Sequence, residues 1–182
     1  PLVPFCNLAI VEHQIAALAK VGVNHVILAV GHMEDAMTKG VKHFEEKYDL
    51  KVTFSIEKEP LGTAGPLGLC RDLLTASEDP FFMLNSDVAC EFPLADMLSF
   101  HKHHGKTGTI LITPVEDPSK YGLVVSEKDT GRIEQFLEKP PAGQSSYPSD
   151  KINAGIYILQ PDVLKLIPEP TVQMSIERQI FP

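Results

Sequence analysis

The first half of the chain alternates segments typical of helices with segments typical of strands, and this alternation is the strongest constraint on its fold. Strand-like segments fall at residues 25–30 (HVILAV), 51–56 (KVTFSI) and 81–84 (FFML), and helix-like segments at 8–21, 33–48, 65–74 and 94–104. Helices of this length between strands imply parallel pairing with right-handed crossovers. We therefore expect an α/β domain whose central strand, 81–84, is apolar on both faces.

The second half has a different pattern. Four strand-like segments lie at residues 109–115, 122–126, 132–138 and 152–159, followed by short helices from Pro161 and across 174–181. Residues 128–131 (KDTG) are typical of a hairpin turn, so part of this half is antiparallel. The expected fold class is α/β and Rossmann-like (GT-A-like): a mixed, mostly parallel sheet flanked by helices, with an antiparallel insertion.

Composition excludes several classes of partner. The net charge is −8 and no basic run is present, which argues against a nucleic-acid surface. No stretch approaches the ~20 apolar residues of a membrane span, so no membrane partner is expected. The three cysteines match no metal or redox spacing, which is typical of thiols in a reducing compartment, and we expect a cytoplasmic protein.

Polar residues follow the central strand directly. Asn85, Ser86 and Asp87 come after FFML, and ligands of open parallel α/β sheets bind beyond the carboxyl ends of the strands. A carboxylate at this position could meet a substrate or Mg²⁺. The alternative is that Asp87 only caps the following turn.

The loop after the strand at 51–56 is a second candidate. It contains Glu59, Pro60, Gly62 and Thr63 and leads into a helix. Gly62 allows the backbone to approach a flat ligand such as a base, and the acidic residues could accept from ring N–H groups. Taken alone, the same residues also fit an ordinary strand-to-helix loop.

A third group of candidates comes from the antiparallel half. Gly122 and the pair Glu138–Lys139 lie at opposite ends of the expected hairpin. A carboxylate for hydroxyls and a lysine for phosphate would suit a sugar phosphate, although a solvated strand end explains the pair equally simply. Asn153 opens an apolar strand, where a buried amide needs partners, either a ligand or backbone.

The histidines of residues 101–104 (HKHH) end an expected helix. Their spacing does not put all three on one face, so a solvated helix end is favoured over a metal site.

Five motifs in sequence order carry a resemblance to a known family. They are EPLGTAG (59–65), LNSD (84–87), PSKYG (118–122), EKP (138–140) and INAGIYIL (152–159). Each is weak alone, but together and in this order they resemble the sugar-nucleotide pyrophosphorylases, and among these the guanylyltransferases that act on mannose 1-phosphate. The resemblance covers essentially the whole chain.

The resemblance implies transfer of a guanylyl group from GTP to mannose 1-phosphate, forming GDP-mannose and pyrophosphate, with Mg²⁺ as cofactor. It implies a role for each matching residue: catalysis and phosphate binding for Lys139, metal binding for Asp87, nucleotide binding for Gly62, Glu59, Pro60, Thr63 and Asn85, and sugar-phosphate binding for Gly122, Glu138 and Asn153. In such a mechanism the protein acts mainly by positioning and charge neutralisation.

The sequence also departs from the family pattern. A Gly-rich loop expected before Pro1 and a second metal-binding Asp expected after Pro182 are not among the 182 residues. We therefore expect residues 1–182 to form a nucleotidyltransferase domain incomplete at both ends and inactive or weak alone. At full length, the resemblance implies a homo-oligomer or a complex with a related regulatory subunit. Two alternatives remain: a non-catalytic regulatory subunit that binds sugar nucleotides, and a related glucose-1-phosphate nucleotidyltransferase.

Overall fold

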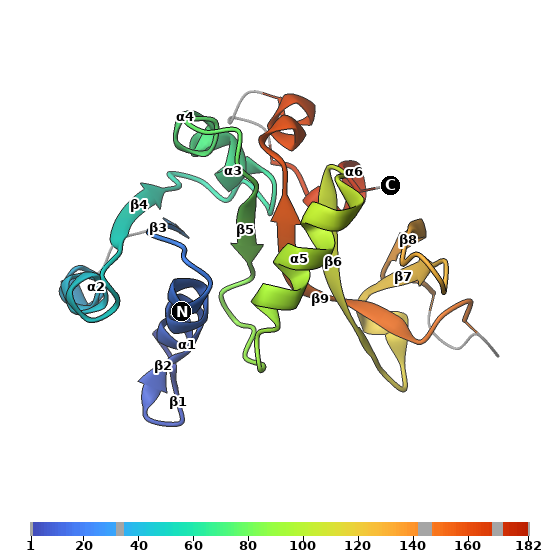
Figure 1. Ribbon diagram of the computed structural model, residues 1–182, viewed down its shortest axis with the longest axis horizontal. Coiled ribbons are helices and arrows are strands. Elements are labelled where there is room, and N and C mark those ends of the chain that lie inside the picture. Colours follow the sequence, from blue (N-terminus) through green and yellow to red (C-terminus); the bar gives the residue numbers. More distant parts are fainter. Residues whose placement is uncertain (1, 32–34, 142–146, 169–172, 182) are drawn as a thin grey trace.

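The computed structural model describes residues 2–31, 35–141, 147–168 and 173–181. The elements are, in chain order, β1 (Pro4–Phe5), β2 (Leu8–Ala9), α1 (Ile10–Lys20), β3 (His25–Val30), α2 (Asp35–Tyr48), β4 (Lys51–Ile56), α3 (Gly65–Leu69), α4 (Arg71–Leu74), β5 (Phe81–Leu84), α5 (Leu94–His104), β6 (Gly108–Pro114), the 3₁₀ helix η1 (Pro118–Lys120), β7 (Gly122–Ser126), β8 (Ile133–Glu138), β9 (Lys151–Leu159), the 3₁₀ helix η2 (Pro161–Leu166) and α6 (Ile176–Gln179). Figure 1 shows how helices and strands interleave. The expected α/β class is confirmed.

A tight hairpin precedes the first helix. Strands β1 and β2 are antiparallel and joined by Cys6 and Asn7, both with positive φ (48° and 69°). Two central residues with positive φ give a turn whose twist matches that of the strands. Helix α1 therefore begins at Ile10 rather than at the expected Leu8.

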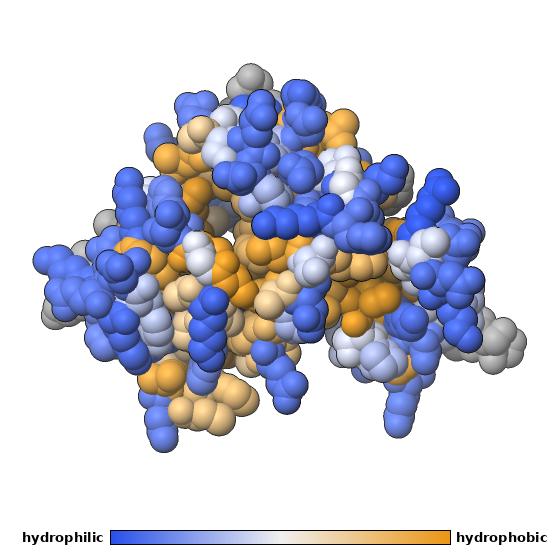
Figure 2. All heavy atoms as spheres, in the orientation of Figure 1, coloured by the Kyte–Doolittle hydropathy of each residue, from blue (hydrophilic) through white to orange (hydrophobic). Residues whose placement is uncertain are grey.

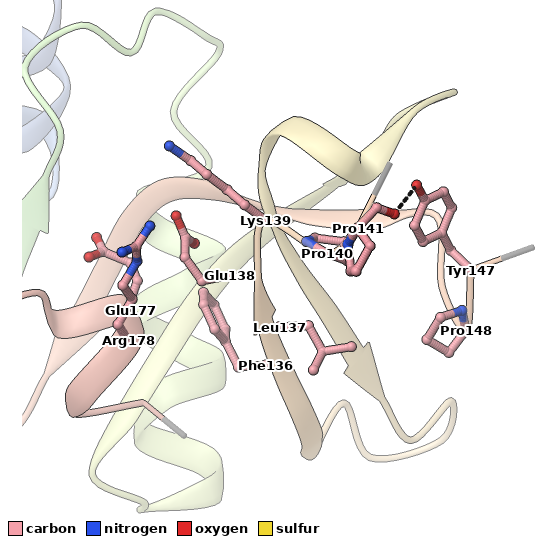
Figure 3. A pocket seen from close by; sticks show the side chains of 10 residues that line it. All are labelled: Phe136, Leu137, Glu138, Lys139, Pro140, Pro141, Tyr147, Pro148, Glu177 and Arg178. Carbon is pink, nitrogen blue, oxygen red and sulfur yellow. Dashed lines mark hydrogen bonds between the residues drawn. The ribbon is translucent and has the colours of Figure 1, made fainter. Parts of the chain in front are cut away.

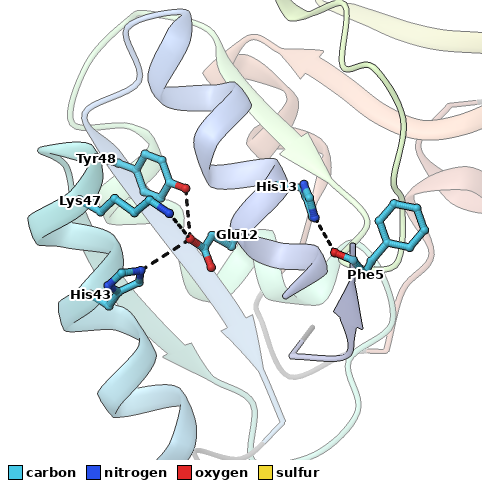
Figure 4. A network of polar contacts seen from close by, with 6 residues as sticks. All are labelled: Phe5, Glu12, His13, His43, Lys47 and Tyr48. Atoms are coloured by element: carbon cyan, nitrogen blue, oxygen red, sulfur yellow. Dashed lines mark hydrogen bonds and ion pairs between the residues drawn. The ribbon is translucent and has the colours of Figure 1, made fainter. Parts of the chain in front are cut away.

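Helices α1 and α2 are joined through a buried carboxylate. Only 6% of Glu12 is exposed, and its Oε1 accepts a hydrogen bond from Lys47 Nζ at 2.8 Å and one from Tyr48 Oη at 3.2 Å. His43 Nε2 lies 3.6 Å from the same oxygen. Figure 4 shows the three α2 side chains converging on Glu12. The Lys47 hydrogen bond holds the pKa of Glu12 below its ordinary value, against the opposing effect of burial.

The strands form a parallel part and an antiparallel part. Strands β3 and β4 pair in parallel, from His25 opposite Lys51 to Val30 opposite Ile56. Strand β9 pairs antiparallel with β5, β6 and β7, and β7 pairs antiparallel with β8. Antiparallel pairing therefore takes a larger share than expected, because β9, from the second half of the chain, lies directly beside the central strand β5.

A bulge bends β9 beside the end of β5. Its pairing with β6 jumps from Tyr157 opposite Ile110 to Asn153 opposite Ile112, so extra residues of β9 leave the ladder. Gly155 lies in this stretch with φ of +74°, which glycine adopts at little cost.

Two apolar clusters form the core. The first joins α1, α2, β3, β4 and α5 to one face of β5 and β9, and the second joins the other face to η2 and α6. In β5, Phe82 and Leu84 pack against the first cluster, whereas Phe81 and Met83 pack against the second. The strand is apolar on both faces, as expected, but all four residues are only half-buried.

The half-burial of β5 has a structural cause. Within the described residues, β3 pairs with β4 alone and β5 pairs with β9 alone, so each has an edge without a partner strand. A cavity of about 760 Å³ is lined by residues of both strands and by side chains of α1 and α3. Figure 2 shows a hollow on this face among apolar side chains, between the part with β3 and β4 and the part with β5.

Other expectations need correction. Residues 65–74 form two short helices broken at Cys70 instead of one. The segment after Pro161 is 3₁₀ rather than α-helical, and the last helix has four residues. Met33, the first residue of the expected helix at 33–48, lies outside the described residues. No helix in the described part of the chain is long and apolar enough to span a membrane.

Candidate active site

The loop after β4 is clamped against the segment before α6. Met174 donates its backbone N–H to the carbonyl of Leu61 at 3.0 Å, and Ala64 donates to the carbonyl of Met174 at 2.9 Å. Gly62 has φ of +75°, and a Cβ there would collide with the Met174 carbonyl. Gly62 is therefore required for the close approach of two backbones, and Thr63 is held beside it.

The other two residues expected at this loop have a different setting. Glu59 and Pro60 are both exposed, and neither lines a described cavity. The acidic residue that organises the loop is Glu57, whose Oε2 accepts from the backbone N–H of Leu61 at 3.1 Å. Gly62 and Thr63 line the cavity of about 760 Å³ together with Glu57 and Asn85.

The turn after β5 is fixed from two sides. Gln14 Nε2, on α1, donates to the carbonyls of Asn85 (2.9 Å) and Val88 (2.8 Å). The backbone N–H of Asn85 donates to the carbonyl of Gly155 at 2.8 Å. The turn that carries Asp87 is thus anchored, and the Asp87 side chain itself is exposed.

Asp87 alone does not make a metal centre. In the described part of the chain, no three His, Cys, Asp or Glu side chains cluster at a spacing suited to a metal ion. Mg²⁺ commonly takes only one or two protein carboxylates and completes its shell with water and substrate phosphate. An exposed carboxylate on a fixed turn fits one such ligand position.

The sugar-side candidates Gly122, Glu138 and Lys139 lie together at the open end of the β7–β8 hairpin, and not at opposite ends as expected, because the two strands pair antiparallel. Gly122 pairs with Glu138, and a Cβ on Gly122 would lie 2.9 Å from Glu138 Oε2 and 2.7 Å from Phe136 Cζ. Glycine at this position therefore leaves room for the carboxylate.

Lys139 is bent out of the strand. It has φ of +50°, which is uncommon for a residue with a Cβ, and its N–H donates to the carbonyl of Tyr121 at 3.0 Å. Figure 3 shows the Lys139 ammonium and the Glu138 carboxylate projecting to the same side of β8. Neighbouring residues of a regular strand would point to opposite faces, so the bend brings the two charges together.

A second cavity, of about 390 Å³, lies at this place. Its lining includes Glu138, Lys139, Tyr147 and, from α6, Glu177 and Arg178. The cavity therefore has two cationic and two anionic side chains, which suits a ligand with both hydroxyls and phosphate.

Asn153 is held by contacts within β9 and α6. Its Oδ1 accepts from the backbone N–H of Gly155 at 2.9 Å, and its Nδ2 donates to Tyr157 Oη at 2.7 Å. Tyr157 Oη donates to Glu177 Oε1 at 3.4 Å. Tyr157 is fully buried, and desolvation raises the pKa of its hydroxyl well above the ordinary value.

Glu177 also reaches the first loop. Its Oε2 accepts from Thr63 Oγ1 at 2.6 Å and from Ser175 Oγ at 2.8 Å. Sequence reasoning did not single out Glu177, Arg178 or Tyr157 as site residues. The local signals were a tyrosine inside an apolar strand and charged residues at a short helix, and neither has a spacing that points to the loop at 61–64.

The structure therefore places most of the expected residues around two neighbouring cavities joined by the Glu177 contacts. Gly62, Thr63 and Asn85 line one cavity, and Glu138 and Lys139 line the other. Asn153 joins the two through Tyr157. Asp87, Glu59, Pro60, Gly122 and Asn153 line neither of them.

Comparison with known proteins identifies relatives over the whole chain. The family description "Nucleotidyl transferase" matches residues 1–180. A Xenopus tropicalis protein named mannose-1-phosphate guanylyltransferase catalytic subunit beta is 56% identical over 183 residues, covering 100% of this chain and 49% of that protein. A Dictyostelium discoideum protein of the same name is 52% identical over the same shares.

Solved structures have the same fold. The crystal structure of HddC from Yersinia pseudotuberculosis aligns with a TM-score of 0.77 at 25% identity, over 100% of this chain and 75% of that one. The same protein complexed with GMP-PN gives 0.74 at 25% identity, over the same shares. UDP-glucose pyrophosphorylase complexed with UDP-glucose aligns at 0.74 with 19% identity, over 97% of this chain and 74% of that one, which shows the fold alone. The chain spans about half the length of the curated relatives it matches.

Proposed function

The chain belongs to the nucleotidyl transferase family, and from this premise we propose that it forms the substrate-binding part of a mannose-1-phosphate guanylyltransferase. The reaction is GTP plus mannose 1-phosphate to GDP-mannose plus pyrophosphate. The choice of guanine and mannose is supported by the 56% identity to a protein named for that reaction. The single observation that carries a transferase site is the contact of the loop at 61–64 with Glu177, which also lines the cavity of Glu138 and Lys139.

The nucleotide side is formed by the loop after β4 and by the end of β5. Gly62 packs against the Met174 backbone and lines the cavity in which its own backbone would contact the face or edge of guanine, and Thr63 keeps that backbone in place. Asn85 contacts nucleotide or sugar at the point where the two sides meet. Glu59 and Pro60 are exposed beside the loop and extend the contact to the edge of the base.

The sugar side is formed by β7, β8 and β9. Glu138 accepts from sugar hydroxyls, and Gly122 leaves room for them. Asn153 has one Nδ2 hydrogen and one Oδ1 lone pair left for the sugar after its internal contacts. Lys139 binds the phosphate of mannose 1-phosphate, because its ammonium projects beside Glu138.

Charge neutralisation near the phosphates involves Asp87. This carboxylate would hold Mg²⁺, and the bound ion would neutralise phosphate oxygens. Lys139 holds the sugar phosphate so that its attacking oxygen lies in line with the α-phosphorus, and its positive charge reduces the repulsion between the two phosphate groups; the bond to pyrophosphate breaks as the new bond forms. This chain's residues thereby act by positioning and electrostatics rather than by covalent catalysis.

The proposal also covers the cellular compartment of the protein and its oligomeric state. All three cysteines are free thiols, Cys70 buried and Cys6 and Cys90 exposed, which supports a reducing compartment such as the cytoplasm. We propose that the protein at its natural length works as a homo-oligomer or with a related regulatory subunit.

The test is GDP-mannose formation by the protein at its natural length with Mg²⁺, GTP and mannose 1-phosphate, beside a panel of other nucleoside triphosphates and glucose 1-phosphate. Lys139→Ala and Asp87→Asn are expected to lower kcat by about 10²–10³, the typical effect of losing one preorganised charged group. The matched controls are Lys128→Ala and Asp129→Asn, both in the exposed turn of the β7–β8 hairpin.

Other outcomes would contradict the proposal in distinct ways. If Lys139→Ala or Asp87→Asn turns over at the unaltered rate, the role proposed for that residue is wrong. Binding of GDP-mannose without turnover favours a non-catalytic regulatory subunit. Faster turnover with another triphosphate or with glucose 1-phosphate favours a related nucleotidyltransferase.

A further inference from the structure

We propose that Glu177 is a positioning residue that couples the nucleotide side of the site to the sugar side by holding Thr63 and the Tyr157–Asn153 pair with its two carboxylate oxygens. The inference rests on the proposed function for its biological meaning, and on the hydrogen bonds of Glu177 for its geometry. Thr63 and Glu177 are 114 residues apart in the chain, so the link exists only in the fold.

The hydrogen bonds on the nucleotide side, which we call the nucleotide arm, end on Glu177 Oε2. Thr63 Oγ1 accepts from the backbone N–H of Ile176 at 2.9 Å and donates to Oε2 at 2.6 Å. Because the Thr63 hydroxyl receives one hydrogen bond and gives one, its orientation is fixed. The loop that would contact the base is thus tied to the first turn of α6.

The hydrogen bonds on the sugar side, which we call the sugar arm, end on the other carboxylate oxygen, Glu177 Oε1. Asn153 Nδ2 donates to Tyr157 Oη at 2.7 Å, and Tyr157 Oη donates to Glu177 Oε1 at 3.4 Å. Burial raises the Tyr157 pKa, so the hydroxyl keeps the proton that it donates. The side-chain amide of Asn153 therefore takes its orientation partly from Glu177.

A carboxylate is required at this position because every neighbour donates. Thr63, Tyr157 and Ser175 each accept from an N–H group and direct their hydroxyl hydrogen at Glu177. A carboxylate accepts on both sides, whereas an amide accepts on one side only. In Glu177→Gln the oxygen can still serve Thr63 and Ser175, and the NH₂ then faces Tyr157. This variant should separate the two arms while leaving the loop in place.

The first measurement needs no substrate. The side-chain amide signals of Asn153, assigned by their loss in Asn153→Asp, are followed by NMR. Thr63→Val and Glu177→Gln are each expected to shift these signals, and Thr75→Val, which removes a hydroxyl bonded only within its own helix region, is the matched control. Unchanged Asn153 signals in both site variants would overturn the coupling.

The second measurement is binding synergy, defined as the ratio of mannose 1-phosphate Kd without and with a bound non-hydrolysable GTP analogue. Glu177→Gln and Tyr157→Phe are each expected to lower this ratio by about fivefold or more, the lower end of typical coupling between sites. The double variant should lose no more than either single one, because both changes cut the same arm. Gln179→Ala is the control for general destabilisation of α6, since its side chain accepts from the Ser175 backbone N–H at the start of that helix and, within the described residues, has no hydrogen bond to Glu177.

The two measurements separate the inference from the proposed function. A protein that binds neither substrate but whose Asn153 signals respond to Thr63→Val overturns the function and supports the coupling. A protein that binds both substrates with the same synergy in all variants overturns the coupling and supports the function.

Discussion

The backbone N–H of Asn85 lies 2.8 Å from the carbonyl oxygen of Gly155 and donates to it, which ties the end of β5 to the bulge in β9. The side chain of Asn85 fills the space beside the same residue: a Cβ added to Gly155 would lie 2.7 Å from Asn85 Nδ2. The turn with Asp87 and the strand with Asn153 therefore meet at a contact that has no spare room.

Gly155→Ala is expected to displace Asn85 and to weaken nucleotide binding. Its φ of +74° adds backbone strain, and strain of this kind costs about 1–3 kcal/mol. Thermal unfolding and GTP titration measure the two effects. Gly22→Ala is the matched control, since Gly22 also has positive φ (+87°) but nothing within 4 Å of its Cβ position. Equal loss of nucleotide affinity in both variants would contradict the contact argument.

Substitutions of Lys139 are expected to change stability through the backbone conformation and turnover through the loss of the ammonium. Its positive φ disfavours any residue with a Cβ, so Lys139→Gly should be more stable than Lys139→Ala by up to about 1 kcal/mol. Both variants should lose turnover, because both lack the ammonium. Urea unfolding and initial rates are the measurements. An active Lys139→Gly variant would show that backbone shape, not charge, is what the site needs.

The Glu12 network predicts how the α1–α2 contact depends on pH. The Lys47 hydrogen bond lowers the pKa of Glu12, so its stabilisation is present above the ordinary value of 4.5 and is lost as pH falls below it. The pKa of Lys47 is raised by the same contact, so this side of the pair fails only above 10.5. Glu12→Gln should cost about 1 kcal/mol at pH 7 and reduce the acid dependence of the unfolding midpoint. Glu46→Gln, exposed on α2 next to Lys47, is the control.

The buried histidines of α5 predict a second, separate acid effect. His101 is 1% exposed and lies between Thr109 and Gln160, and burial lowers its pKa. The unfolded chain then binds more protons, so stability is complete above pH 6.5 and falls as pH drops below it. His101→Gln should flatten this slope, by at most about 1.4 kcal/mol per pH unit for one proton. His103→Gln, exposed on the same helix, should leave it unchanged; a flat profile in the unaltered protein would refute the assignment.

Local pattern was enough to predict the strands from β3 onward, whereas β1 and β2 were missed. The bounds of β3, β4, β5 and β7 match those read from the sequence, because each is a short apolar or alternating run between turn residues. The start of α1 was misplaced because a hairpin with Cys6 in its turn has little sequence signature. His101 was expected at a solvated helix end, whereas it is buried, because β6 and Gln160 pack over that side of α5.

The site was predictable only in part, for a similar reason. Gly62, Asn85, Glu138 and Asn153 stand at element ends, where sequence position already suggests a ligand. The role proposed for Glu177 depends on the hydrogen bonds between residues 174–176 and the loop at 61–64. Contacts between segments more than 100 residues apart leave no local pattern to read.

The edge of β3 that faces the cavity has a consequence for hydrogen exchange. Successive residues of a strand direct their N–H groups to opposite sides, and the carbonyls of Asn24 and Val30 accept from Lys51 and Glu57 of the β4 side. Even-numbered residues of β3 therefore face β4, and odd-numbered ones face the cavity. In deuterated water the amides of His25, Ile27 and Ala29 should exchange fast, because no described strand pairs with that edge of β3. The amides between them, which face β4, should stay protected. Exchange rates along β3 would therefore alternate between fast and slow from one residue to the next.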